Sequence, residues 1–187
     1  MYSVPINQVT PEMRAAAKTL NFGISYGKGI PKIADDLGVS EAEATEFRWK
    51  FFEPFAALRR WRSNAGQRAI HKLFSQTLWG RLRYFNSANG KTWEQWQLKN
   101  RGINSPVQGT CGDLFKLALH WLSSRLESYD TKIINLVHDE FVLEAPESEV
   151  EEIVPIVKET LESAGRYFIK EVPVVVDIEV RDNWAKT

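Results

Sequence analysis

The stretch from which the rest of the chain can be interpreted is Arg14-Ala-Ala-Ala-Lys18-Thr-Leu-Asn-Phe22-Gly-Ile-Ser-Tyr26-Gly27. Arg14, Lys18, Phe22 and Tyr26 recur every four residues, and on an α-helix this spacing places them along one slowly drifting face. Cations at the start of such a face suit phosphates, and the flat rings that follow suit a base or a sugar. The face therefore suits a nucleoside triphosphate. The alternative is an amphipathic helix whose rings lie in the core and whose cations are solvated.

The same stretch resembles the nucleotide-binding helix of family A DNA polymerases, whose pattern is R-x-x-x-K-x-x-x-F/Y-G-x-x-Y-G. Every fixed position of that pattern is matched, both glycines included. The resemblance implies that Arg14 and Lys18 hold the triphosphate of an incoming dNTP and act in catalysis by offsetting charge on its phosphates. It also implies that Phe22 packs on the incoming sugar and base and that Tyr26 stacks on the template base. Gly27 belongs to the same substrate-binding set, where close approach of a ligand is easiest.

Length and composition restrict the class of protein. The 187 residues suffice for one ordinary domain or two small lobes, and a hydrophobic content of 43% favours a folded chain. The single cysteine, Cys111, excludes an internal disulfide and a cysteine-based zinc site, and it fits a reducing cytosol. No run of 18 apolar residues and no signal-peptide pattern occurs. We therefore expect a soluble cytoplasmic protein without a membrane partner.

A formal net charge of zero hides an uneven distribution of charge. Residues 59–101 contain ten Lys or Arg and a single acid, Glu94. Six aromatic residues are interleaved with these cations: Trp61, Trp79, Tyr84, Phe85, Trp93 and Trp96. Phosphate contacts combined with stacking indicate a nucleic-acid partner. The alternative is a solvated helix face with tryptophans in the core.

Periodicity predicts a mostly helical chain with short strands. Residues 1–9 are expected to form an extended lead-in, and the chain from there to residue 72 is expected to be helical. Alternation in 73–78 and 81–84 predicts a β-hairpin, and a long helical region is expected from Trp93 to Leu126, with an interruption near Pro106. The alternating apolar residues of 174–180 predict a last strand.

A second informative stretch is His138-Asp139-Glu140, which lies between the apolar runs 133–137 and 141–143. The arrangement predicts a hairpin with a charged tip, which is either merely solvated or a rigid mount for a metal ligand. Val137-His138-Asp139-Glu140 resembles the third sequence motif of family A polymerases. This implies that Asp139 is a catalytic residue that binds Mg²⁺, since hard carboxylate oxygens suit this ion. His138 and Glu140 are implied to support the primer terminus.

Two further stretches imply contacts with DNA. Arg101-Gly-Ile-Asn104-Ser-Pro-Val-Gln108-Gly109 resembles the family pattern R-x-x-N-x-P-x-Q-G, which implies that Asn104 and Gln108 meet the minor groove of the primer-template, with Arg101 beside them. Without the resemblance, helix capping around Pro106 is an equal alternative for the two amides. Gly80-Arg81-Leu82-Arg83 resembles the family's G-R-R-R hairpin, from which the leucine departs. This implies phosphate contacts for Arg81 and Arg83.

The resemblance implies an incomplete family A polymerase fold of the α/β (α+β) class. Residues 1–72 are expected to form a helical, fingers-like lobe with the nucleotide-binding helix, and residues 73–187 a partial palm with a small antiparallel sheet. The implied function is that of a DNA-directed DNA polymerase, in which this chain supplies the dNTP-binding helix and one metal-binding aspartate.

One family motif, D-x-S-x-x-E-L-R, which carries the other metal-binding aspartate, does not occur in the sequence. Because each Mg²⁺ needs several oxygen ligands, one aspartate does not hold two ions alone. We therefore expect the C-terminal subunit of a split polymerase, active with an N-terminal subunit that carries this motif; a piece of a longer polymerase is the alternative. Two other readings stay open: a non-catalytic nucleic-acid-binding remnant, and an interaction protein that regulates another polymerase.

Overall fold

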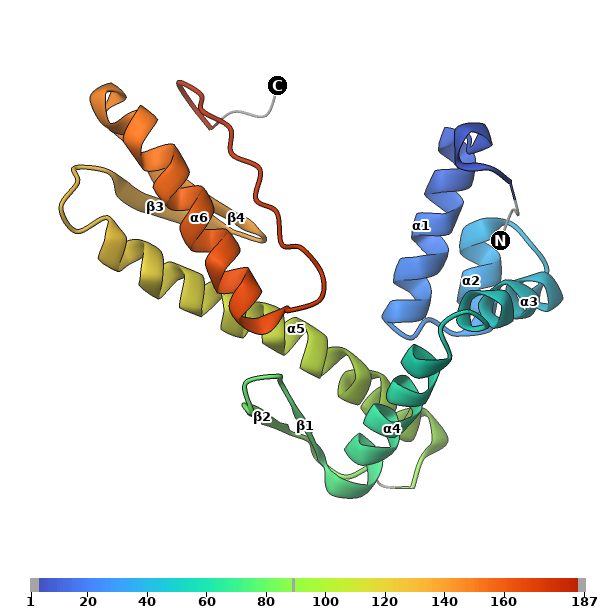
Figure 1. Cartoon of the computed structure of the whole chain (residues 1–187). Helices are drawn as coiled ribbons and strands as arrows, with labels where there is room; N and C mark the ends of the chain where they lie inside the picture. The colour runs from blue at the N-terminus through green and yellow to red at the C-terminus, as the bar shows by residue number, and fades with distance from the viewer. Residues whose placement is uncertain (1–3, 89, 185–187) are drawn as a thin grey trace. The chain divides into compact units, whose positions relative to one another are not determined.

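The computed structural model describes residues 4–88 and 90–184. The chain forms two compact units, residues 1–108 and 109–187, and the helix α5 (Thr92–Arg125) contributes to both (Figure 1). Helices predominate, accompanied by two separate two-stranded antiparallel sheets. This confirms the predicted fold class. The predicted division into a fingers-like lobe and a partial palm after residue 72 stays a prediction.

The first unit opens with a short 3₁₀ turn and four helices: η1 (Ile6–Gln8), α1 (Pro11–Ser25), α2 (Ile30–Leu37), α3 (Glu41–Phe52) and α4 (Ala56–Lys72). Local chemistry explains where they begin. Thr10 Oγ1 accepts from the backbone N–H of Met13, and the side chains of Ser40 and Glu43 form a reciprocal capping box at α3. The core of α1, α2 and α3 is a single cluster: Leu20, Ile24, Ile33, Ala34, Ala44 and Phe52.

Helices α4 and α5 approach closely through small residues. A Cβ atom built on Gly102 of α5 would lie 2.2 Å from Cβ of Ala69 in α4 and 3.2 Å from the carbonyl oxygen of Ala65. Glycine is therefore required here by space rather than by backbone conformation. Beside this contact, β1 (Phe74–Gln76) and β2 (Leu82–Tyr84) form the predicted hairpin.

Helix α5 continues through Pro106, so the expected interruption near this residue is wrong. A proline inside a helix has no N–H to donate four residues back, which leaves the carbonyl of Gly102 without that bond. The packing of α4 against the small residues of α5 holds the helix together across this gap in its hydrogen bonding.

In the second unit, β3 (Lys132–Val137) and β4 (Glu140–Glu144) form a hairpin, followed by η2 (Glu147–Glu149) and α6 (Val150–Phe168). Figure 1 shows α6 running beside this hairpin. The core joins α5 to α6 through Leu122, Leu126, Ile153 and Val157, with Ile133, Phe141 and Leu143 from the strands packed against it. The rings of Phe115 and Phe141 stack with their centroids 4.4 Å apart.

The expected last strand at 174–180 is wrong, because this segment pairs with no strand. Its alternation is nevertheless real: Val174, Val176 and Ile178 are partly buried, while their neighbours are exposed. The backbone N–H of Val176 donates to the carboxylate of Glu162 in α6 at 3.3 Å, where a strand would have used a neighbouring carbonyl. The segment thus packs on a helix instead of extending a sheet.

None of the helices within residues 4–88 and 90–184 combines the length and the apolar character needed to cross a membrane.

The close approach at Gly102 generates a prediction about stability. In Gly102→Ala, overpacking costs about 1–3 kcal/mol or more, against a gain of about 1 kcal/mol in helix propensity, so we expect a net loss in the free energy of unfolding. The double variant Gly102→Ala/Ala69→Gly removes the clashing methyl group and should lose less than the sum of the two single variants. Urea denaturation of all four proteins measures this coupling. Strict additivity would contradict the described packing.

Glu149 generates a second prediction. Its carboxylate accepts from the hydroxyl of Thr131 (2.6 Å) and from the backbone N–H groups of Asp130 (2.9 Å) and Thr131 (3.0 Å). The Thr131 hydroxyl first, then these N–H groups and the charge of Lys132, lower the pKa of Glu149 from its ordinary value of 4.5. Because the folded pKa is the lower one, the stabilisation is complete above about pH 4.5 and is lost as the pH falls through the folded value.

We therefore expect Glu149→Gln, whose amide accepts through one oxygen only, to lower the melting temperature more at pH 7 than at pH 3. The neighbouring exposed Glu147→Gln is the matched control and should change the melting temperature little at either pH. Thermal denaturation followed by circular dichroism tests both variants. Equal losses at the two pH values would show that the ionised carboxylate is not the stabilising form.

Candidate functional site

The face of α1 that was singled out in the sequence lies on the surface. Arg14 and Lys18 are exposed, and Phe22 and Tyr26 are 49% and 51% exposed. The two rings stack with centroids 6.3 Å apart and planes within 13°, and Nζ of Lys18 lies 5.9 Å from the centroid of Phe22. The other side of α1 supplies the core. The four side chains therefore form a continuous accessible strip, rather than the core rings of the alternative interpretation.

Three side chains from α4 and α5 donate hydrogen bonds to the carbonyl of the last residue of α1 and to the two carbonyls that follow it, and we call these side chains the C-terminal latch. The bonds run from Arg62 Nη1 to Ser25 O (2.9 Å), from Asn104 Nδ2 to Tyr26 O (3.4 Å) and from Asn100 Nδ2 to Gly27 O (3.2 Å). Backbone N–H groups of residues 26–28 satisfy the carbonyls of Phe22, Gly23 and Ile24. The latch satisfies the three carbonyls that come next, which have no partner within the helix. It fixes the end of α1, and with it the position of Tyr26.

The latch accounts for the glycine at position 27 and gives Asn104 a partner. It also includes Arg62 and Asn100, which the sequence patterns did not indicate. Gly27 has a φ of 77°, and a Cβ atom there would lie 2.2 Å from Oδ1 of Asn100, so both its conformation and its neighbour require glycine. Asn104 Nδ2 also donates to the carbonyl of Tyr26. The minor-groove contact implied for Asn104 stays a prediction. Arg62 and Asn100 stand in no sequence pattern that would have singled them out.

Arg62 of the latch is partly buried. Its guanidinium carbon lies 5.8 Å from the ring centroid of Phe52, in the core of the helical cluster. Burial first, and the nearby positive charge of Arg48 second, lower the pKa of Arg62. Arginine nevertheless stays charged, so its bond to the Ser25 carbonyl is charge-assisted.

The residues implied to contact the phosphates or the minor groove of DNA lie on the β1–β2 hairpin and on the first half of α5, in the same unit. Arg81, Arg101 and Gln108 are exposed. Arg83 is held differently, because its Nη1 donates to Oγ of Ser105 at 3.0 Å and its guanidinium lies 5.7 Å from the ring of Phe85.

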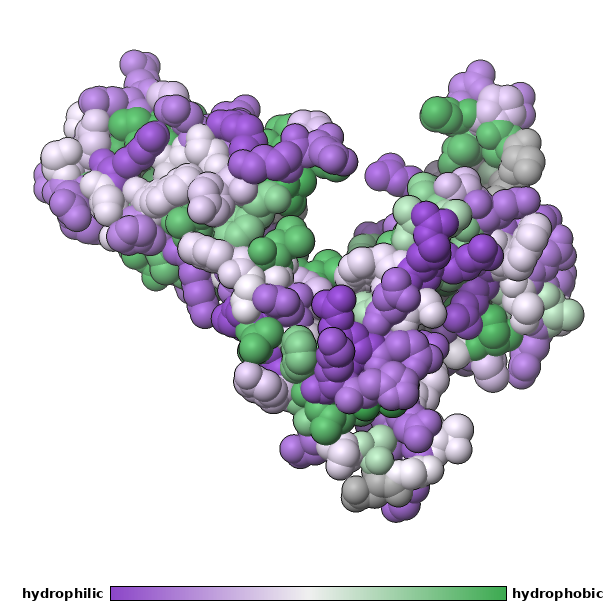
Figure 2. Space-filling model, turned by 60° about the horizontal axis from the view of Figure 1, so that its bottom comes forward, coloured by the Kyte–Doolittle hydropathy of each residue, from purple (hydrophilic) through white to green (hydrophobic). Residues whose placement is uncertain are grey.

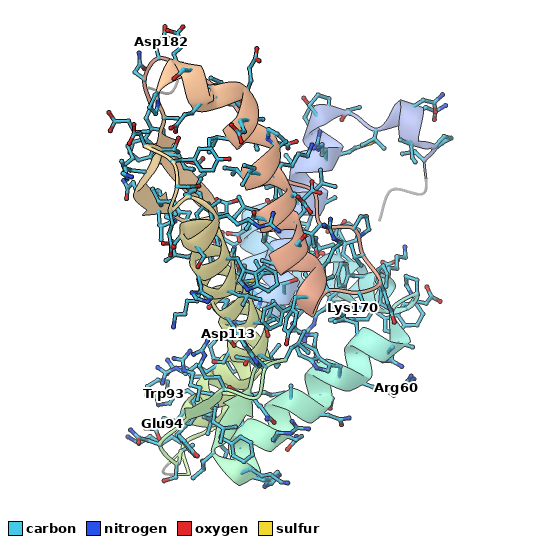
Figure 3. All side chains as sticks on the ribbon, turned by 60° about the vertical axis from the view of Figure 1, so that its left-hand side comes forward. Arg60, Trp93, Glu94, Asp113, Lys170 and Asp182 are labelled. Carbon is cyan, nitrogen blue, oxygen red and sulfur yellow. The ribbon has the colours of Figure 1, made fainter. Side chains whose placement is uncertain are left out.

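Exposed rings accompany these cations, as the interleaved sequence suggested. They include Trp79 and Tyr84 on the hairpin and Trp96 on α5, together with Trp93, which Figure 3 labels at the first turn of α5. These rings lie at the surface and are not core tryptophans.

The tip of the β3–β4 hairpin is the two-residue turn His138-Asp139, which Val137 and Glu140 close as the last strand pair. His138 has a φ of 52°, in the left-handed region. His138, Asp139 and Glu140 are all exposed. The short turn and the two paired strands give the carboxylate of Asp139 a rigid mount at the surface.

The fit of a metal ion to this tip is partial. Within residues 4–88 and 90–184, no three His, Cys, Asp or Glu side chains lie close enough together to hold a metal. Mg²⁺, however, usually keeps several waters and is bound through one or two carboxylates plus substrate phosphates. A single exposed aspartate suits a share of such a coordination shell and does not make a complete site.

Comparison with known proteins places these features in a family. A model described as DNA polymerase family A matches residues 1–186. The chain is 35% identical over 185 residues to the thermostable DNA polymerase I of Thermus thermophilus, covering 98% of this chain and 22% of that protein. It is 36% identical over 190 residues to DNA polymerase I of Caldicellulosiruptor bescii, covering 100% and 22%. The chain thus spans about a fifth of the length of the curated relatives it matches.

A solved structure shares the arrangement of the backbone. The polymerase domain of the M. smegmatis enzyme, in complex with DNA primer-template and dNTP, superposes with a TM-score of 0.82 at 28% sequence identity, covering 87% of this chain and 29% of that one. The mostly helical chain with two small antiparallel sheets thus matches part of a polymerase domain. The exposed strip of α1 and the charged hairpin tip agree with this match, which extends over residues 1–186. The chain belongs to DNA polymerase family A.

Proposed function

We propose that this chain takes part in DNA-templated DNA synthesis in the cytoplasm, supplying the helix that binds the incoming dNTP and one carboxylate for Mg²⁺. The observation that carries the proposal is the exposed strip of α1, in which two cations precede two stacked rings. The family match, and the neighbouring enzyme solved with primer-template and dNTP, support the same assignment.

In this proposal the strip of α1 divides into two functions. Arg14 and Lys18 hold the triphosphate and offset the charge that develops on it during transfer. Lys18 also donates a proton to the departing pyrophosphate. Phe22 packs on the incoming sugar and base, and Tyr26 stacks on the template base. The C-terminal latch holds Tyr26 at a fixed distance along the helix, which a test of base-pair geometry requires.

Asp139 supplies one oxygen ligand for Mg²⁺ from the hairpin tip, with His138 and Glu140 placed next to the primer terminus. When bound, Mg²⁺ supplies positive charge that favours ionisation of the primer 3′-hydroxyl and neutralises the phosphates. The hairpin and α5 hold the duplex: Arg81, Arg83 and Arg101 bind backbone phosphate, while Asn104 and Gln108 face the minor groove.

The second carboxylate comes from a polypeptide that carries D-x-S-x-x-E-L-R, which we propose is a separate N-terminal subunit. The second unit has surface to receive it. Ile134 on β3 is 56% exposed, and Val175 and Val180 in the extended segment are 69% and 63% exposed. In the part of the chain that the structure describes, β3 and β4 each pair along one edge only. Figure 2 shows hydrophobic residues on the surface among hydrophilic ones. An added strand would cover apolar surface and use free backbone groups.

The metal-binding part of the proposal predicts the behaviour of Asp139→Asn. In a mixture of this chain, the N-terminal subunit, primer-template and dNTP, the variant should lower the rate of primer extension by about a hundredfold or more, because an amide is a poorer ligand for Mg²⁺. DNA binding, measured by fluorescence anisotropy, should stay within about twofold, since no phosphate contact is lost.

The matched control is Glu144→Gln, an exposed acid at the other end of β4, which should leave extension unchanged. Without the N-terminal subunit, the chain should not extend a primer. Robust extension by the chain alone would refute the split arrangement, and unchanged extension by Asp139→Asn would favour a non-catalytic binding module.

The nucleotide-binding part predicts the behaviour of Lys18→Ala. We expect kcat for dNTP incorporation to fall and KM for dNTP to rise, for a combined loss of about a hundredfold in kcat/KM, because one cation serves both the bound triphosphate and the leaving group. Lys50→Ala, which removes an exposed lysine of α3, is the matched control. Equal effects of the two variants on steady-state kinetics would show that Lys18 acts only through overall charge.

A further inference from the structure

A recess opens in the first unit, away from the strip of α1, where α4 and α5 meet the β1–β2 hairpin. Its volume is about 170 Å³. Because a cavity of about 150 Å³ is enough to hold benzene, the recess has room for an aromatic ring. Its lining includes Trp61, Asn64, Arg68, Gln76, Gly102 and Pro106.

The α4 side of the recess is formed by one exposed face of that helix. Trp61, Asn64 and Arg68 lie three and four residues apart, so they share one face of the helix. This face carries an indole, an amide and a guanidinium. All three side chains are exposed, with Trp61 at 40%. The stripe therefore meets the recess with a ring face and with hydrogen-bonding groups.

The α5 side contributes backbone chemistry. Pro106 cannot donate to the carbonyl of Gly102, and both residues line the recess. The close contact of Gly102 with Ala69 brings the backbones together here and leaves space beside them. The amide of Gln76 comes from β1. The Nε2 of Gln76 already donates to the carbonyl of Gly80 at 3.4 Å. The recess therefore offers a stacking surface, donors from the Asn64 amide and the Arg68 guanidinium, and a carbonyl acceptor that the helix does not use at its usual position.

The segment of the sequence that supplies most of the recess is basic, which favours an anionic ligand. Residues 54–93 contain eight Lys or Arg and no Asp or Glu. Arg60, one helical turn before Asn64, extends from α4 in Figure 3. A flat, hydrogen-bonding ring that arrives with negative charge attached is a nucleobase on a phosphate backbone.

We infer that this recess binds one unpaired nucleobase of single-stranded DNA, with the ring on Trp61 and the adjoining phosphate on Arg68. The inference rests on the nucleic-acid-binding part of the proposed function. It assigns a second contact, separate from the dNTP strip and the Asp139 tip, through which a single strand is held beside the hairpin.

The test is binding of a fluorescein-labelled 12-nucleotide adenine strand and of the same strand with abasic sites, followed by anisotropy at fixed salt without metal or dNTP. Stacking of one base on an aromatic side chain predicts that Trp61→Leu weakens binding of the adenine strand by about fivefold or more and leaves the abasic strand unchanged. Trp49→Leu, which removes an exposed indole of α3, is the matched control and should change neither.

Arg68→Gln and Arg59→Gln remove the same charge from opposite sides of α4, because nine residues turn the helix by about half a circle. Arg68→Gln should weaken both strands more than Arg59→Gln does. Equal losses from the two arginine variants, or from the two tryptophan variants, would overturn the inference. If Trp61→Leu fails to fold, as circular dichroism would show, Asn64→Ala and Arg68→Gln carry the same comparison on exposed positions.

Neither the metal nor the incoming nucleotide enters this measurement, so its failure leaves the assignments of Lys18 and Asp139 standing. Conversely, base-dependent binding through Trp61 that persists in Asp139→Asn would support the recess even if primer extension failed.

Discussion

The hydrogen bonds between the C-terminal latch and the end of α1 are the constraint on which the proposed nucleotide site depends. A helix that presents cations and rings to solvent on one side can slide or rotate unless something fixes it. Arg62, Asn100 and Asn104 fix it at three consecutive carbonyls, from two other helices. Since these carbonyls have no partner within α1, the latch satisfies them and sets the position of Tyr26 together.

The latch depends in turn on how closely the helices of the first unit approach. Gly27 admits the amide of Asn100, and Gly102 admits Ala69 of α4. At Gly102 the backbones of α4 and α5 come close together. At Gly27 the absence of a side chain lets the short side chain of Asn100 reach the end of α1. The same close packing opens the recess beside Trp61, because the larger side chains of α4 have to lie next to the contact and not in it. The end of α1 and the recess beside Trp61 therefore depend on one packing arrangement.

Sequence patterns predicted the elements whose causes are local. The capping box at Ser40, the apolar face of α1 and the two hairpins follow from spacing and turn chemistry, and the structure has them. The segment 174–180 shows the limit, because alternation predicts an extended chain but not whether a neighbouring strand exists to pair with it. Helix α5 shows another limit of prediction from sequence. It continues through Pro106 beside close contacts with α4, and no local pattern indicates these contacts.

The candidate site divides in the same way. The strip of α1 could be read from the sequence because helical periodicity alone aligns its four side chains. Arg62 and Asn100 could not, since their role arises from contacts 37 and 73 residues apart in the chain. For Asn104 the sequence pattern implies a contact with DNA, whereas its bond to the Tyr26 carbonyl follows only from the fold. Sequence motifs thus indicate candidate ligand-binding side chains. The residues that hold such side chains in position are found only from the packing of the fold.

The most direct test of the account is an experimental structure of this chain with the N-terminal subunit, primer-template and a non-hydrolysable dNTP. We expect the triphosphate to lie on Arg14 and Lys18, with the carboxylate of Asp139 close to the same phosphates. A triphosphate bound away from α1, or an Asp139 directed away from it, would refute the proposed nucleotide site.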